Sequence, residues 1–427
     1  MNLENFTDRP THRRRAKRRR VMLRALSITL GLAIAFGIAE LCLRIGGVSM
    51  PSLYVPDQFC GSRLRASTSG LWTFEGCGEI YVNSHGFRAS EFPLEKPPGV
   101  FRIAVLGDSF VEALQVDESD TLCLRLEKLL NRANRQPDRK FQVINCGVSG
   151  YGTAQQLQML QHHVLPLSPD AVFLAVFPGN DIRNNSRILE ADPARPYFRI
   201  GADRQLILDT AFLKSAPYVA AMTDYEQRKA FLVNRSRVLQ VLKHVNHNGL
   251  NFGFQIASDA NLEKTLIESV NESIYAYRPS EEAEHVEAWK TTQFLLQEFS
   301  KHCYNANVPL FVFTVSTPIQ VYPDTKLRSR IAIDVGIEDL FYSQKRILDT
   351  ARSAGAHCFP LASRMQEVAD EHGMILHGFP NTAMGLGHWN ESGHGVAASL
   401  LATWLQRSGM FDSLQPQEVA EPSFDGG

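Results

Sequence analysis

The chain has 427 residues, and its acidic and basic side chains nearly balance, to a net charge of −1 at pH 7. This balance excludes bulk electrostatic attraction to nucleic acid, so no nucleic-acid partner is expected. The length allows one large domain or two ordinary ones, with additional segments at the ends.

A basic cluster and an apolar run open the chain. The cluster RRRAKRRR covers residues 13–20, and the run ALSITLGLAIAFGIAELCL covers residues 25–43. A helix of about 20 apolar residues is long enough to span a membrane, and basic residues before it favour a cytoplasmic N-terminus. We therefore expect a basic cytoplasmic tail at 1–20 and a transmembrane anchor at 21–46. The rest of the chain would then lie outside the cytoplasm, in the periplasm or the extracellular space.

Two other readings of this segment stay open. Small residues at positions 37–39 suit the cleavage site of a signal peptide, and a basic cluster is also typical of a nucleic-acid-binding tail. A lipoprotein signal is disfavoured because Leu41 directly precedes Cys42, where a small residue is expected.

The seven cysteines follow no metal-ligand spacing, and no cofactor loop is evident, so neither a metal nor a cofactor is expected. Outside the cytoplasm, disulfides become feasible. Cys60 with Cys77 is the first candidate pair, and Cys303 with Cys358 is the second.

Residues 47–100 are rich in turn formers and are predicted to be a connector with short strands. Strands and helices then alternate, which predicts a parallel sheet with helices on both faces. Asp120 or Ser119 is expected to cap the first helix. The predicted strands are 101–107, 141–147, 170–177, 308–318 and 356–362, and the predicted helices are 119–134, 152–164, 288–303, 337–354 and 395–406.

The alternation breaks between about 187 and 285. This polar segment has one clear helical stretch, SRVLQVLKHV, and is interpreted as an insertion into a domain at 101–410. It either caps the edge at which the strands end or is a surface elaboration. The tail at 411–427 is acidic, contains Pro and Gly, and is expected to be disordered.

Polar residues follow three of the predicted strands. Ser109 follows the first in VLGDSF, the glycine-rich turn NCGVSGYGT follows the second, and Asn180 follows the third in FPGND. Sites in open parallel sheets form at the carboxyl ends of the strands, so these groups are expected to meet. A phosphate loop is disfavoured because the turn lacks a Lys-Ser/Thr ending. Taken singly, each motif also suits an ordinary turn.

A histidine, His388 in HWNESGH, precedes the last predicted helix. In this order the four motifs resemble the SGNH, or GDSL, hydrolase superfamily over roughly residues 80–190 and 286–408. The stretch NSHGFR at 83–88 is similar to one in its membrane-anchored bacterial branch. The resemblance implies an α/β fold, a flavodoxin-like three-layer sandwich with a parallel sheet.

The resemblance also implies roles for individual residues. Ser109 would be the nucleophile and His388 the general base. The Ser109 N–H, the Gly150 N–H and the Asn180 side chain would form the oxyanion hole. Four further residues are expected to hold local loop structure, namely Asp108, Asn390, Asp181 and His394.

The acid that usually completes such a site is absent. Family members carry an Asp two or three residues before the histidine, but Leu386 and Gly385 occupy those positions here. That Asp orients the imidazole. Candidate replacements are a main-chain carbonyl, Asn381 or a residue of the insertion, whereas Glu391 is a poor candidate because it points into the helix region. We expect a Ser–His dyad or a displaced acid.

By the resemblance, the protein is a membrane-anchored extracytoplasmic serine esterase that forms an acyl-enzyme on O-acylated cell-envelope glycans or lipids. If a sugar hydroxyl replaces water, it is instead an O-acyltransferase of envelope polysaccharide. A catalytically weakened SGNH-fold binding protein is the third reading, and Leu386 is the feature that favours it.

Overall fold

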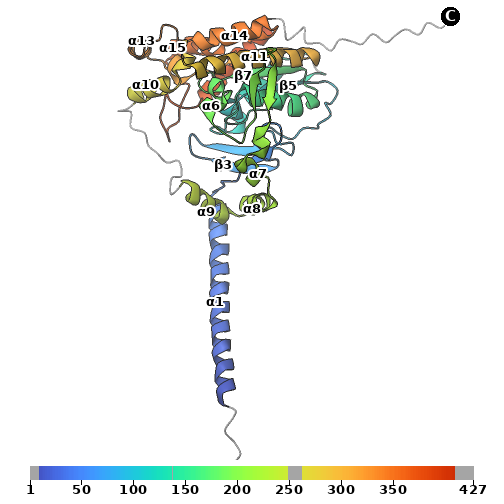
Figure 1. Ribbon diagram of the computed structural model, residues 1–427, viewed down its shortest axis with the longest axis vertical. Helices are drawn as coiled ribbons and strands as arrows, with labels where there is room; N and C mark the ends of the chain where they lie inside the picture. Colours follow the sequence, from blue (N-terminus) through green and yellow to red (C-terminus); the bar gives the residue numbers. More distant parts are fainter. Residues whose placement is uncertain (1–8, 137, 249–261, 409–427) are drawn as a thin grey trace, which may run out of the picture.

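A sheet of five parallel strands forms the centre of the globular part (Figure 1). The computed structural model describes residues 9–136, 138–248 and 262–408. The strand order is β11-β10-β7-β5-β6. This is the flavodoxin-like order, in which the chain runs to one side of the first strand and then switches to the other. The strand bounds, in that order, are His357–Phe359, Leu310–Thr314, Ala171–Val176, Val100–Leu106 and Lys140–Asn145.

Helices cover both faces of the sheet because the strands carry apolar side chains on both sides. In β5, Ala104 and Leu106 face one core, while Phe101, Ile103 and Val105 face the other. The predicted three-layer α/β sandwich is therefore confirmed. The first core is closed by α4 (Thr153–Met159), α11 (Ala283–Asn305) and α14 (Tyr342–Ser353), and the second by α3 (Leu122–Ala133), α15 (Leu361–His372) and α16 (Glu391–Arg407).

Capping side chains set the helix ends, and two predicted ends were wrong for this reason. α3 is capped by Thr121, whose Oγ1 accepts from Leu124 N at 3.3 Å, and not by Asp120 or Ser119. α16 begins at Glu391 rather than at 395, because the Asn390 side chain accepts from Gly393 N at 3.0 Å.

The segment at 47–100 folds as two antiparallel hairpins. β1 (Tyr54–Asp57) pairs with β2 (Gly61–Leu64), and β3 (Thr68–Trp72) pairs with β4 (Gly78–Val82). Leu114, from the segment after Ser109, shares a small core with these hairpins. The hairpins thus pack directly against the neighbourhood of the predicted nucleophile.

The segment at 187–285 contains more structure than the one helix predicted. Two of its side chains reach the carboxyl ends of the strands: Arg195 donates to Gly150 O, and Tyr275 OH donates to Gly179 O at 2.9 Å. Other parts, around α8 and α9, lie at the base of the globular part (Figure 1). The elements are α6 (Arg187–Glu190), β8 (Tyr197–Ile200), β9 (Leu206–Asp209), α7 (Ala216–Ala221), α8 (Asp224–Arg235), α9 (Arg237–Asn248) and α10 (Leu262–Glu272).

A single long helix, α1 (Arg9–Ile45), extends from the base of the globular part (Figure 1). Its stretch Arg14–Ile45 is long and apolar enough to cross a membrane, and none of its most apolar window is buried in the protein. Part of the predicted basic tail, residues 1–8, and the predicted disordered tail at 411–427 lie outside the described residues.

All seven cysteines are free thiols, so both predicted disulfides were wrong. The Cys60 side chain is buried, with Sγ 3.8 Å from Gln155 O, whereas Cys77 is exposed. Cys303 is on the buried side of α11, while the Cys358 thiol donates to Leu348 O at 3.4 Å. The two members of each predicted pair therefore lie in different surroundings.

Candidate active site

Ser109 lies just after the carboxyl end of β5, the strand between β7 and β6 at which the order of the strands across the sheet changes direction. It is the first residue of a short helix, α2 (Ser109–Glu112). Asp108 caps this helix by accepting from Phe110 N at 3.0 Å. The turn therefore presents the Ser109 hydroxyl at the sheet edge where ligands bind in open α/β folds.

His388 meets Ser109 at this edge. Its Nε2 lies 2.8 Å from Ser109 Oγ. The Phe110 ring packs against the imidazole, with ring centres 4.8 Å apart. Two of the predicted site residues, separated by 279 positions in the chain, are thus brought within hydrogen-bond distance.

A carboxylate completes the contact on the other side of the imidazole. Glu75, from the turn between β3 and β4, lies with Oε2 at 2.5 Å from His388 Nδ1. Its Oε1 accepts from the His388 backbone N–H at 2.7 Å. The site is therefore a Ser–His–Glu chain, in which the acid comes from the N-terminal hairpins.

The sequence analysis missed Glu75 and named other groups for this place. Asn381 was wrong as a replacement acid. It instead holds the Glu75 turn, accepting from Gly76 N at 2.9 Å and donating to Thr73 O at 3.1 Å and Gly76 O at 2.9 Å. Glu391 is exposed at the start of α16. Neither the insertion nor a main-chain carbonyl supplies the partner of Nδ1. No local pattern marks Glu75, because only the packing of the hairpin brings it to the histidine.

Glu75 and His388 each favour the charged form of the other. Burial opposes ionisation of Glu75, but the hydrogen bonds and charge of His388 outweigh it and hold the pKa of Glu75 below its usual range. Burial likewise opposes protonation of His388, but Glu75 outweighs it and raises the pKa of His388 above its usual value. The pair is thus suited to stabilise an imidazolium that forms during a reaction.

Two backbone N–H groups near Ser109 have no protein acceptor in the described part of the chain, namely those of Ser109 and Gly150. Gly150 has a φ of +78°, a conformation that favours glycine, and open space surrounds the position of a Cβ. Its carbonyl is held by Asn184 Nδ2 at 3.1 Å and by Arg195. Free N–H groups at such a turn can stabilise a developing oxyanion.

A buried carboxylate, Glu112, forms hydrogen bonds with the turn that carries Gly150. It accepts from Ser149 N at 3.0 Å, from Ser149 Oγ, and from Tyr54 OH at 3.0 Å. Burial raises the pKa of Glu112 to about 7, although the hydrogen bonds from Ser149 and Tyr54 act against that rise. Because Glu112 lies one turn after Ser109, it ties the Ser109 turn to the Gly150 turn.

Asn180 follows β7 and lies close to Asp108, the residue before Ser109. Asp108 and Asp181 are both fully buried here, and burial raises the pKa of each. Asp181 accepts from Phe177 N at 3.0 Å and so shapes the turn that carries Asn180. In the geometry, Asp108 and Asp181 each accept a backbone hydrogen bond within their own turn.

A polar network fixes the loop that carries His388. His377 contacts Gly387 O through Nδ1 at 2.7 Å and Ser316 Oγ through Nε2 at 3.0 Å. Trp389 Nε1 donates to the same Ser316 Oγ at 2.8 Å. Asn390 caps α16, and His394 Nδ1 accepts from Leu122 N at 3.3 Å. These residues hold the loop in place. Among the described residues, their side chains form no hydrogen bond with the side chains of Ser109, His388 or Glu75.

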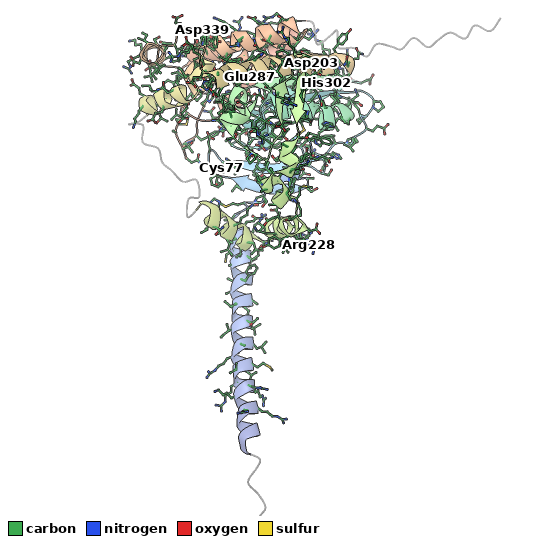
Figure 2. All side chains as sticks on the ribbon, viewed as in Figure 1. Cys77, Asp203, Arg228, Glu287, His302 and Asp339 are labelled. Atoms are coloured by element: carbon green, nitrogen blue, oxygen red, sulfur yellow. The ribbon has the colours of Figure 1, made fainter. Side chains whose placement is uncertain are left out.

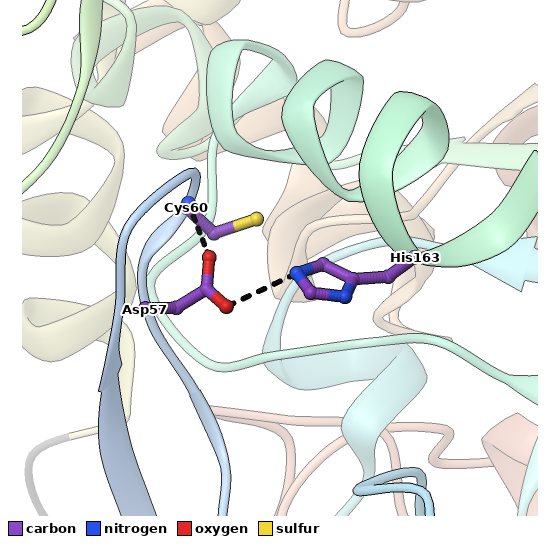
Figure 3. Close-up of side chains that lie close together, drawn as sticks. All are labelled: Asp57, Cys60 and His163. Atoms are coloured by element: carbon purple, nitrogen blue, oxygen red, sulfur yellow. Dashed lines mark hydrogen bonds and ion pairs between the residues drawn. The ribbon is translucent and has the colours of Figure 1, made fainter.

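A second polar cluster, away from Ser109, consists of Asp57, Cys60 and His163 (Figure 3). Its potential metal-ligand atoms lie within 4.8 Å of one another. Asp57 already accepts from Phe59 N at 2.9 Å and Cys60 N at 2.8 Å, and it contacts His163 Nε2 at 3.0 Å. Arg63 lies 3.4 Å from the other ring nitrogen, so a positive group flanks the cluster. We interpret it as a clamp between the first hairpin and the helical segment after α4.

The comparisons with known proteins were made at three levels. No family model and no curated protein matches the chain. Among solved structures it is similar to an alpha/beta hydrolase from the metagenome of Lake Arreo, Spain, with 12% identity over 71% of this chain and 94% of that one, at a TM-score of 0.35. An acetyl xylan esterase from Geobacillus stearothermophilus has 10% identity over 72% and 94%, at 0.35. A two-domain esterase active on acetylated mannans has 11% identity over 73% and 50%, at 0.35.

Structural similarity at this level does not show which reaction a protein catalyses. The evidence for a reaction therefore has to come from the residues of the site. The chain resembles the SGNH superfamily in two respects that its own sheet displays. Its motifs lie at the ends of β5, β6 and β7, and these strands are neighbours in the sheet. Ser109 and His388 then meet at that edge.

Proposed function

We propose that this protein is a membrane-anchored serine esterase of the SGNH type, with Ser109 as nucleophile, His388 as general base and Glu75 as the orienting acid. The observation that supports this most strongly is the continuous contact from Glu75 Oε2 to His388 Nδ1 (2.5 Å) and from His388 Nε2 to Ser109 Oγ (2.8 Å). A carboxylate, an imidazole and a hydroxyl in this order activate the hydroxyl for attack on an acyl carbon.

The reaction proceeds in two halves. Ser109 Oγ attacks the ester carbonyl and passes its proton to His388 Nε2, and the tetrahedral intermediate then expels the alcohol, which takes that proton. The acyl group is left as an ester on Ser109. A water molecule next gives a proton to His388, attacks the acyl carbon and releases the acid, and the proton returns to Ser109.

The negative oxygen of each tetrahedral intermediate is bound by the N–H groups of Ser109 and Gly150 and by the Asn180 amide. The unpaired state of the two N–H groups and the closeness of Asn180 to the Ser109 turn support this assignment. Each such donor contributes about 3 kcal/mol to transition-state stabilisation, as judged from the removal of comparable donors.

The substrate in this proposal is an O-acylated glycan or lipid of the cell envelope. This proposal is supported by the expected location of the globular part. α1 has the length and composition of a membrane span, and the basic cluster at 13–20 precedes its apolar run. Such a charge bias favours a cytoplasmic N-terminus and a globular part on the opposite side of the membrane.

The test is ester hydrolysis by the full chain in detergent micelles, with an activated short-chain acyl ester as substrate. Ser109→Ala is expected to abolish turnover, while Ser119→Ala, an exposed serine ten positions further on, retains it. Equal rates for Ser109→Ala and the parent protein contradict the proposal. A mass increase of one acyl group on the Ser109 peptide after rapid quenching identifies the intermediate.

Hydrolysis and transfer differ only in the second nucleophile. The same preparation, given an acetylated glycan and an unacetylated oligosaccharide, distinguishes them by the product. Free acetate supports the esterase, and acetylated oligosaccharide in its place identifies an O-acyltransferase with the same residues in the same roles.

A further inference from the structure

Exposed apolar side chains are concentrated in one segment of the globular part. Outside α1, fourteen large apolar residues are exposed among the described residues, and six of them lie between positions 219 and 242. Such a concentration marks a surface that contacts a protein or a membrane, whereas exposed apolar residues scattered singly need no explanation. The six residues, from α7, α8 and α9, are Val219, Met222, Tyr225, Phe231, Leu232 and Leu242.

Basic side chains are interleaved with these apolar ones. The exposed face of α8 carries Arg228, Lys229 and Arg235 beside its apolar residues, and Lys229 also pairs with Glu226 at 3.1 Å. The Arg235 guanidinium lies 3.9 Å from the centre of the Phe231 ring. Figure 2 places Arg228 at the base of the globular part, near the upper end of α1. A face that mixes apolar and basic groups is the type that lies in the interface of an anionic membrane.

The contact between α1 and α9 sets the depth of this segment relative to the apolar helix. Glu40 of α1 accepts from Arg237 N and Val238 N, both at 3.0 Å, and from Ser236 Oγ at 2.9 Å. Arg44 donates to Arg235 O at 2.7 Å. Glu40 therefore binds the first turn of α9, and α1 and α9 meet where α1 leaves the globular part (Figure 1).

Glu40 belongs to the apolar run at 25–43 and lies about 6 Å along the helix axis before Arg44, at 1.5 Å per residue. The start of α9 consequently lies level with the last turn of the apolar run. A carboxylate at that depth needs partners, and the α9 N-terminus supplies them. When α1 spans a membrane, α9 therefore lies at the depth of the lipid headgroups.

We propose that α7, α8 and α9 form an interfacial platform that inserts its exposed apolar side chains into the lipid leaflet on the side of the globular part. The proposal rests on the proposed anchoring by α1 and goes beyond it. One helix alone leaves the globular part free to tilt, whereas a helix and a platform together set its tilt and its height. His244 of α9 also packs on Phe74, with ring centres 5.1 Å apart, so the platform touches the residue before Glu75.

The test uses the full chain in vesicles of phosphatidylcholine and anionic phosphatidylglycerol, with the phosphatidylcholine brominated near the top of its acyl chains. Bromine quenches tryptophan only at short range. Phe231→Trp and Leu242→Trp probe the platform, Phe36→Trp probes α1, and Ile333→Trp, exposed on α13 (Thr325–Asp334), is the remote control. The signal of the parent protein, which has four tryptophans, is subtracted.

The expected result is that bromination reduces the added fluorescence of both platform variants by at least half as much as that of Phe36→Trp, and leaves Ile333→Trp unchanged. If only Phe36→Trp is quenched, the platform proposal is overturned, anchoring stands, and the patch belongs to a protein partner. If Phe36→Trp is not quenched either, the anchoring and the platform both fail. Hydrolysis of a soluble ester, measured on each variant, reports separately on folding and on the proposed esterase.

Discussion

Glu75 holds His388 at two points, although 313 residues separate them in the chain. One oxygen accepts from the backbone N–H and the other contacts Nδ1, so both the loop and the ring orientation are set. Any side chain at Gly387 would collide with this carboxylate, and the φ of +71° there favours glycine as well. The glycine directly before His388 therefore makes room for an acid that comes from elsewhere in the chain.

The first prediction concerns the charge of Glu75. Glu75→Gln is expected to reduce kcat by about 10³- to 10⁴-fold, because an amide N–H facing Nδ1 favours the wrong tautomer of His388. The measurement is ester hydrolysis under saturating substrate. Glu79→Gln, on the exposed side of β4, is the matched control and should retain the parent kcat. A Glu75→Gln variant with full activity would exclude Glu75 as the acid.

The second prediction is the pH dependence of activity. His388 accepts a proton only when neutral, and Glu75 raises the pKa of His388 above its usual 6.5. Activity is therefore low in acid, and rises with a midpoint above that value. In Glu75→Gln the largest remaining influence is burial, which lowers the pKa of His388, so the midpoint of the residual activity should move to lower pH. An unmoved midpoint in kcat/KM profiles would contradict the coupling.

The third prediction concerns Leu386, which occupies the usual position of the acid. Leu386 packs against the apolar core. Leu386→Asp is expected to leave kcat at or below the parent value, since Glu75 already binds Nδ1, and to lower stability by about 1–3 kcal/mol. Ester hydrolysis and thermal unfolding check the two parts. A higher kcat would indicate that His388 lacks an effective acid.

At the scale of elements, the N-terminal hairpins are part of the site. α2 is four residues long and ends at Ala113 in the left-handed region, with a φ of +57°. Arg88 holds this end by donating to the carbonyls of Glu112 at 2.7 Å, Val116 at 2.6 Å and Ala113. A strained turn of this kind persists only where its surroundings hold it.

The stretch NSHGFR, residues 83–88, positions the Arg88 side chain. Asn83 Oδ1 accepts from His85 N and Phe87 N, both at 3.0 Å, and so folds a tight turn just before the arginine. Burial lowers the pKa of Arg88 to about 10, while neighbouring acids such as Glu112 act against the fall. The stretch at 83–88 thus stabilises the Ser109 turn from outside the sheet.

The fourth prediction follows from this clamp. Arg88→Lys is expected to destabilise the protein by about 2–4 kcal/mol, because a single ammonium cannot satisfy carbonyls spread around a planar guanidinium, and unpaired buried carbonyls are costly. The measurement is thermal unfolding of the full chain in micelles, with Arg132→Lys, exposed on α3, as control. Equal unfolding midpoints for the two variants would show that the clamp is dispensable.

At the scale of the whole molecule, hydrogen bonds join α1 to the globular part, and no described residue of α1 belongs to a hydrophobic core. Glu40 makes these contacts from α1 itself. In the segment that follows α1, Ser52 N donates to Asn234 Oδ1 and Met50 N donates to Gln240 Oε1, both at 2.7 Å. The helix, the hairpins and the α8–α9 pair therefore meet at one junction. In the proposed anchoring, this junction sets how the site is presented above the membrane.

The fifth prediction tests the junction. Glu40→Ala removes the partner of the α9 N-terminus and is expected to increase amide hydrogen exchange in peptides covering 236–241. Activity on a soluble ester should stay within about twofold of the parent value, since the contact is remote from Ser109. Ser27→Ala, whose hydroxyl bonds only within α1, is the control. Unchanged exchange in Glu40→Ala would show that α9 is held by other contacts.

Much of the fold follows from local patterns. The apolar strands, the amphipathic helices and the glycine-rich turn are each encoded within about fifteen residues, and parallel strands necessarily end at one edge. That is sufficient to predict that Ser109, Gly150 and Asn180 lie close together. The motif order adds His388, which precedes a helix that packs beside the same edge.

The sequence by itself determined the α/β sandwich, the apolar N-terminal helix and four of the five segments that carry the proposed site residues. Only the tertiary structure decided the acid, the free cysteines and the junction of α1 with α9. The reason is physical: Glu75, Cys60 and Glu40 acquire their partners through contacts across long stretches of chain, and no periodicity or turn signal encodes which hairpin or helix will reach them.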